Sequence, residues 1–144
     1  MNLEKALALA VSAHTGQTDK VGEPYILHPL RVMMKMRGKA ERIVAALHDV
    51  VEDSAITLAD LRTAGFSEEI IEAVDGLTRR ENESYEDYIT RASFNPIARK
   101  VKIADLEDNM DLRRLNNLED ADRDRMTRYR KTYRLLTGRD YIAP

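Results

Sequence analysis

Apolar residues recur every three or four positions along most of the chain, which is the spacing of one buried helix face. Residues 3 to 13 illustrate the pattern, because Leu3, Leu7, Ala10 and Val11 share a face and the pattern stops at a Thr-Gly pair. The same spacing predicts further helices over about 29–36, 39–52, 58–64, 68–79, 85–93, 96–115 and 119–137. No segment alternates as a strand would, so we expect an all-α fold.

Polar residues mark the start of several of these helices. Two pairs have capping-box spacing with aspartate as the second partner, and two more positions are N-cap candidates: Thr57 with Asp60, Ser84 with Asp87, Ser67, and Asn95 before Pro96. Glycines at 38 and 138 are expected to close the helices that precede them. These signals predict a bundle of short helices joined by short loops.

The composition fits one compact helical domain over residues 1–144, long enough to bury a core without disulfide bonds or structural metal ions. Charged residues make up 33% of the chain and aromatics only 6%. The opening apolar run contains Glu4 beside Lys5, which favours an N-terminal helix over a signal sequence. No stretch has the length needed to span a bilayer. We therefore expect a cytoplasmic protein.

The charge balance limits the classes of partner. A formal net charge of −2 gives no overall positive field for nucleic acid or an anionic membrane, so phosphate recognition must be local. The basic residues of the last helix alternate with core positions and are expected to face solvent. Because the chain has no cysteine, metal chemistry would have to use His, Asp and Glu. The sequence does not indicate an oligomeric state.

The segment LHDVVED, residues 47–53, concentrates ionisable groups on a predicted helix. His48 lies four positions before Glu52, and Asp49 four before Asp53, so these side chains occupy adjacent rows. Carboxylates packed side by side repel one another unless a cation or hydrogen bonds offset the repulsion. A bound metal ion would offset this repulsion. The alternative without a metal is an exposed acidic helix end with a capped histidine.

The segment VKIADLEDNM, residues 101–110, places an acid, an amide and a base together. Asp105 and Asn109 share a helical face, and Lys102 lies one turn before Asp105. Taken alone, this arrangement is more typical of a surface salt bridge with no function. The three histidines of the chain, His14, His28 and His48, each fall at the end of a predicted helix beside a loop.

Together these residues carry a resemblance. The spaced set of His28, His48-Asp49 and Asp105 resembles the H…HD…D signature of the HD phosphohydrolase superfamily. More narrowly, AHTGQTDKVGEPYILHPLRV, AALHDVVEDS and VKIADLEDNMDLRRL resemble the hydrolase domain of RelA/SpoT proteins in its short stand-alone form. The resemblance implies an HD-domain helical bundle and a metal-dependent enzyme.

The resemblance also implies roles for individual residues. The metal, typically manganese or another divalent ion, would be held by His28, His48, Asp49 and Asp105. The catalytic acidic pair would be Glu52 and Asp53, which could position and deprotonate a metal-bound water. The implied reaction removes the 3′-pyrophosphate of (p)ppGpp, and the expected substrate-binding residues are Lys20, Asn109, Lys102, Arg79, Arg80 and Tyr85.

The chain departs from the family pattern at positions that read the substrate. Asp19 stands where an arginine is expected, Val21 replaces a residue that is often serine, and Leu106 replaces another arginine. Three further acids, Glu107, Asp108 and Asp111, would add negative charge nearby. Two alternatives therefore stay open: a hydrolase acting on a different nucleotide phosphate, and a nucleotide-binding module without turnover. The long relatives' synthetase half has no room in 144 residues, so no nucleotide synthesis is expected.

Overall fold

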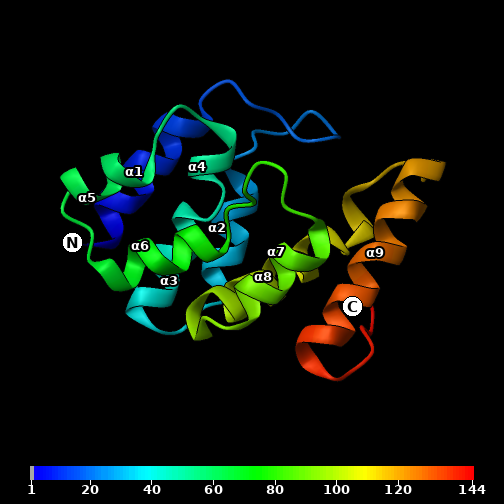
Figure 1. Cartoon of the computed structure of the whole chain (residues 1–144). Helices are drawn as coiled ribbons and strands as arrows, with labels where there is room; N and C mark the ends of the chain where they lie inside the picture. The colour runs from blue at the N-terminus through cyan, green and yellow to red at the C-terminus, as the bar shows by residue number, and fades with distance from the viewer. Residues whose placement is uncertain (1) are drawn as a thin grey trace.

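The computed structural model describes residues 2–144 and confirms the all-α expectation (Figure 1). Within these residues there is no strand, only an isolated bridge between Thr18 and Pro24. The helices are α1 (Leu3–His14), α2 (Leu27–Met34), α3 (Lys39–Leu47), α4 (Val50–Asp53), α5 (Leu58–Thr63), α6 (Glu68–Gly76), α7 (Tyr85–Ser93), α8 (Pro96–Asn109), a 3-10 turn η1 (Leu112–Arg114) and α9 (Asp120–Thr137).

Side-chain caps start several helices where the sequence predicts them. Thr57 and Asp60 form the reciprocal capping box, with each side chain accepting from the other's backbone N–H. Ser67 and Asn95 cap α6 and α8. Ser84 accepts from the Asp87 N–H, but the reverse bond of a capping box is not formed.

The predicted continuous helix over 39–52 is wrong, because it breaks at His48 and Asp49. The Nδ1 atom of His48 lies 2.7 Å from the carbonyl oxygen of Ala45. That ring nitrogen therefore competes for a carbonyl that a continuing helix would use, and Asp49 adopts φ −105° and ψ 0°. The break separates His48 and Asp49 from the short helix that carries Glu52.

Three other predicted boundaries are also wrong. The helix expected over 96–115 ends at Asn109, where the chain turns into η1. The helix expected over 68–79 ends at Gly76, and Arg91 donates to the freed carbonyl oxygens of Asp75 and Thr78. Gly38 does not close α2 but stands at the start of α3, whereas Gly138 closes α9 with φ 72° as predicted.

The buried side chains form two clusters that share α8. The larger joins α1, α2, α3, α6 and the first half of α8. The smaller joins α7, the second half of α8 and α9, which lies to one side of the other helices in Figure 1. The candidate site lies near the boundary between the clusters, where α2, α3 and α8 pack together. None of the described helices combines the length and apolar character required to cross a bilayer.

Candidate metal centre and adjoining cavities

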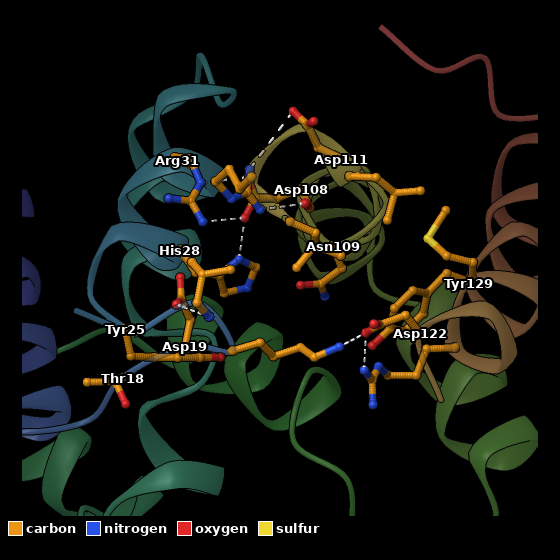
Figure 2. A pocket seen from close by; sticks show the side chains of 17 residues that line it. Thr18, Asp19, Tyr25, His28, Arg31, Asp108, Asn109, Asp111, Asp122 and Tyr129 are labelled. Carbon is orange, nitrogen blue, oxygen red and sulfur yellow. Dashed lines mark hydrogen bonds and ion pairs between the residues drawn. The ribbon is translucent and has the colours of Figure 1, made fainter. Parts of the chain in front are cut away.

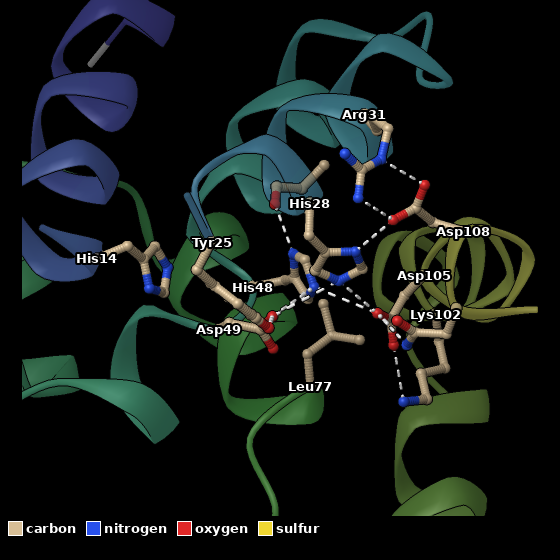
Figure 3. A network of polar contacts seen from close by, with 12 residues as sticks. His14, Tyr25, His28, Arg31, His48, Asp49, Leu77, Lys102, Asp105 and Asp108 are labelled. Carbon is tan, nitrogen blue, oxygen red and sulfur yellow. Dashed lines mark hydrogen bonds and ion pairs between the residues drawn. The ribbon is translucent and has the colours of Figure 1, made fainter. Parts of the chain in front are cut away.

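The four side chains expected to bind a metal converge, although they come from three separate segments (Figure 3). His28 lies in the first turn of α2, His48 and Asp49 at the break between α3 and α4, and Asp105 in α8. The Nε2 atom of His28 is 2.9 Å from Asp105 Oδ1 and 3.7 Å from Asp49 Oδ2. The Nε2 atom of His48 is 3.1 Å from Asp49 Oδ2 and 3.5 Å from Asp105 Oδ1.

The hydrogen bonds of the two imidazoles decide which ring atoms are left to bind a cation. His48 Nδ1 must donate to the Ala45 carbonyl, and the buried Nε2 atom of His48 has no hydrogen-bond partner among residues 2–144. His28 Nδ1 contacts Asp108 Oδ2 at 2.6 Å, so in the neutral ring its Nε2 atom also carries a free lone pair. Two ring nitrogens and two carboxylates thus face one another as acceptors, and this mixed set fits a divalent transition metal.

The electrostatics of the cluster indicate the same demand for positive charge. Burial would lower the pKa of His48, but the carboxylates of Asp49 and Asp105 outweigh burial and hold this pKa well above its usual value. Burial would raise the pKa of Asp105, but Lys102 and the two histidines hold it well below its usual value. Lys102 Nζ lies 2.9 Å from Asp105 Oδ2, which leaves Oδ1 facing the imidazoles.

Three residues fix the predicted ligands in place: Tyr25, Arg31 and Asp108. The sequence indicates Asp108 only as added negative charge and gives no role to the other two. The Tyr25 hydroxyl donates to Asp49 Oδ2 at 2.5 Å. Asp108, which is buried, accepts from His28 Nδ1, and Arg31 donates to both of its oxygens at 2.8 and 3.1 Å. Asp108 therefore does not add free negative charge, and its spacing of three from Asp105 on α8 was the available signal.

The two predicted catalytic acids differ in position. Glu52 Oε1 accepts from the Arg79 backbone N–H at 2.5 Å and lines the cavity that contains the histidines. Partial desolvation, followed by the charges of Asp49 and Asp53, raises the pKa of Glu52. Asp53 is exposed, and its pKa is raised first by partial desolvation and then by Asp49. It does not line this cavity.

The cavity at the cluster has a volume of about 220 Å³ and reaches α9. Besides the four converging side chains and Glu52, it is lined by four of the predicted substrate-binding residues: Lys102, Asn109, Arg79 and Tyr85. A second cavity of about 310 Å³ adjoins it and contains Lys20 (Figure 2). The two share Tyr25, His28, Asn109 and Tyr129, so together they form one elongated site. Arg80 lies apart, paired with Asp75 at 3.0 Å.

The departures at positions 19 and 106 have structural explanations. Asp19 Oδ1 accepts from the backbone N–H groups of Val21 and Glu23, so its carboxylate holds the loop in a tight turn. Leu106 is fully buried in the smaller core cluster beneath α9. An arginine at position 106 would place a charge in that core, and therefore this position does not face a substrate.

Helix α9 closes the far side of the second cavity. Its buried Asp122 forms an ion pair with Lys20 across the cavity and accepts a hydrogen bond from Arg125 (Figure 2). Partial desolvation and the neighbouring Arg125 lower the pKa of Lys20. The predicted substrate cation at position 20 is thus paired within the protein.

Comparison with known proteins defines the class of this fold and site. A family model described as HD domain matches residues 6–115, and the chain belongs to that family. Domains of this family bind divalent metals, which agrees with the convergence of His28, His48 and Asp49 within 4.8 Å.

The chain is similar to particular members of the family. It is 37% identical over 110 residues to guanosine-3′,5′-bis(diphosphate) 3′-pyrophosphohydrolase of Vibrio cholerae, an alignment that covers 74% of this chain and 15% of the relative. It is 37% identical over 89 residues to the bifunctional (p)ppGpp synthase/hydrolase SpoT of Escherichia coli, covering 59% of this chain and 12% of the relative. The chain thus spans a minor part of the length of these relatives.

A solved structure shares the fold over nearly the whole chain. It is that of a metazoan SpoT orthologue described as hydrolysing ppGpp, with a TM-score of 0.78 and 22% identity. The match covers 96% of this chain and 86% of the other. It therefore includes α9, which lies beyond the residues matched by the family model.

Proposed function

We propose that this chain is a metal-dependent phosphohydrolase that removes the 3′-diphosphate of (p)ppGpp. The observation that carries the proposal is the convergence of two imidazole Nε2 atoms and two carboxylates beside Glu52 in a cavity that continues into a second one. The names of the similar proteins support this substrate. Manganese is the proposed metal, because the nitrogen and oxygen donors suit a divalent transition ion. The absence of cysteine supports the cytoplasm as the proposed location.

In this hydrolysis, different residues of the chain accept the proton of the water and orient the metal-binding side chains. When bound, a divalent cation would lower the pKa of a water molecule and offset charge on the reacting phosphate. Glu52 accepts one proton from the attacking water, and its raised pKa makes it a better base near neutral pH. The water oxygen forms a bond to phosphorus, the bond from phosphorus to O3′ breaks, and O3′ ends with a proton as pyrophosphate leaves. Tyr25 and Asp108 keep Asp49 and His28 oriented throughout.

A turnover assay tests the proposal. Purified protein with manganese is expected to release pyrophosphate from ppGpp, and Glu52→Gln is expected to lower kcat by about a hundredfold or more while manganese still binds. Glu81→Gln is a suitable control, because Glu81 is exposed and does not line the cavity that contains the cluster. Failure of the intact protein with manganese, magnesium and cobalt would remove the alarmone assignment.

A second candidate is hydrolysis of a different nucleotide phosphate at the same metal. It is favoured by one observation: Asp19 holds a turn where the resemblance implies an arginine, and Lys20, an expected substrate-binding residue, is paired with Asp122. A panel of nucleotides assayed for phosphate and pyrophosphate release separates the two candidates. Tight nucleotide binding without product would instead support a regulatory module, and transfer of pyrophosphate to GTP would contradict the expected absence of synthesis.

A further inference from the structure

Two arginines from distant segments lie over the same tyrosine ring at the wall of the metal cavity. The Arg128 Cζ atom is 4.8 Å from the centroid of the Tyr85 ring, and the Arg79 Cζ atom is 5.9 Å from it. All three residues line the cavity that contains His28, His48, Asp49 and Asp105. Arg128 was expected to face solvent on the last helix, so tertiary packing alone brings it to this cavity.

Tyr85 is a fixed platform for the two arginines. The Thr132 hydroxyl of α9 donates to the Tyr85 phenolic oxygen at 3.2 Å, which ties α7 to α9. The Tyr85 ring also packs edge-on against Tyr88, with centroids 6.0 Å apart. Tyr88 is buried and donates to the Leu77 carbonyl at 3.0 Å. The position of Tyr85 is therefore set by α7 itself, by α9 and, through Tyr88, by the residue that follows α6.

The two guanidinium groups retain unused donors. Arg79 donates from Nε to the Glu83 carbonyl at 3.0 Å, and its terminal nitrogens make no hydrogen bond within residues 2–144. The Arg128 guanidinium has neither a hydrogen bond nor a carboxylate partner in the same range, in contrast to Arg91, which pairs with Glu83 at 2.8 Å. Two like charges beside one ring repel each other, and an anion bound by both would offset that repulsion.

The cavity is consequently asymmetric in charge. Asp49 and Asp105 lie against the two histidines, and Glu52 is held by the Arg79 backbone N–H. The guanidinium groups of Arg79 and Arg128 lie at Tyr85 in the same cavity and have no carboxylate partner within residues 2–144. A diphosphate, whose two phosphorus atoms are joined through one bridging oxygen, would direct its second phosphate toward the arginines when the first lies at the histidines. Guanidinium groups bind phosphate oxygens through paired, charge-assisted hydrogen bonds.

We infer that Arg128, together with Arg79, binds the terminal phosphate of the diphosphate group that is removed. The inference rests on the proposed function and deepens it, because such a subsite selects a diphosphate over a monophosphate at the reacting position. It also assigns α9 a direct part in the site.

The test is a calorimetric titration of inorganic pyrophosphate into the metal-free full-length chain, since free metal would itself bind the probe. Wild-type protein is expected to bind pyrophosphate, and Arg128→Ala to weaken that affinity about tenfold. Arg128→Lys, which keeps the charge but not the paired donors, is expected to fall between the two. Arg130→Ala is the matched control, an exposed arginine of the same helix that lines neither cavity, and is expected to stay within about twofold of wild type.

Each outcome decides the inference. Equal affinity in wild type and Arg128→Ala, or no binding by wild type at millimolar pyrophosphate, would overturn it. The measurement needs no turnover, so it separates the subsite from the reaction. Arg128-dependent pyrophosphate binding in a protein that never hydrolyses ppGpp would refute the proposed function and leave the subsite standing.

Discussion

The base of the site, called the floor below, and the helix on its far side, called the wall, differ in the residues that form them. The floor is the cluster of His28, His48, Asp49 and Asp105, held by α2, α3 and α8 within residues matched by the family model. The wall is α9, which lies outside that match and contributes Asp122 and Arg128. The floor contains buried, mutually constrained groups, whereas the wall contains an internal ion pair and an unpaired cation. Under the proposed function, the core therefore holds the metal-binding residues and the last helix selects the substrate.

Removing an imidazole from the floor is expected to have the largest effect. His48→Ala should lower turnover by roughly a thousandfold or more and abolish metal binding, because the cluster loses a ring nitrogen that is free to bind the metal. His14→Ala is the matched control, since His14 is equally buried but bonds to Gln17 outside the cluster. Steady-state kinetics and metal titration check both variants, and a His48→Ala enzyme with normal turnover would contradict the assignment of the floor.

Replacing Leu106 by arginine, the residue that the resemblance implies at this position, tests how α9 packs over the core. Leu106→Arg is expected to destabilise the fold by about 3 kcal/mol or more, because it places an unpaired charge in the core beneath α9. Leu106→Met, which conserves volume, should cost less than about 1.5 kcal/mol. Urea unfolding gives both values. A Leu106→Arg variant as stable as wild type would show that α9 does not cover this position in solution.

The support of His28 predicts a smaller effect on metal affinity. Asp108→Asn is expected to weaken manganese binding about 10- to 100-fold, because His28 loses the charged acceptor that fixes its tautomer and orientation. Asp111→Asn is the control, since Asp111 bonds mainly to Arg113 and not to a predicted ligand. Calorimetry measures manganese binding, and the thermal unfolding midpoint of each metal-free variant measures its stability. Together they distinguish a misoriented His28 ring from an unfolded protein. Unchanged affinity in Asp108→Asn would remove this positioning role.

The smallest expected effect concerns the loop that carries Arg79. The Arg91 guanidinium, and then the Arg80 backbone N–H, lower the pKa of Glu83 to about 2. Because the folded pKa of Glu83 is depressed, the stabilisation is present above the ordinary carboxyl pKa of 4.5 and is lost as the pH falls toward 2. Glu83→Gln should therefore be less stable than wild type at pH 7, and the difference should shrink through this window.

Unfolding midpoints measured from pH 7 down to pH 2.5 check the Glu83 prediction, with Glu86→Gln as an exposed control on the same segment. A difference between Glu83→Gln and wild type that is constant across this range would mean that the ion pair does not hold the loop.

The set of residues that form the floor is what the resemblance to the HD family implies, and the local sequence pattern adds only the helix on which each residue lies. His28 precedes Pro29 at a helix start, and Asp105 lies on the apolar-patterned α8. The break at His48 could not be read from periodicity, since it depends on a side chain competing for the Ala45 carbonyl. The roles of Asp108 and Arg128 depend on α2, α7 and α9 meeting α8, which no local pattern encodes. Solvent-facing spacing is therefore a correct local description of Arg128, which is exposed, but it does not indicate that this residue lines the metal cavity.

The most direct test of the central claim is a crystal structure of the full chain grown with manganese, using anomalous scattering to locate the ion. The account predicts an anomalous peak enclosed by the Nε2 atoms of His28 and His48 and the carboxylates of Asp49 and Asp105, with Glu52 nearby and not coordinated. An anomalous peak elsewhere on the chain, or none at this cluster at saturating manganese, would contradict it.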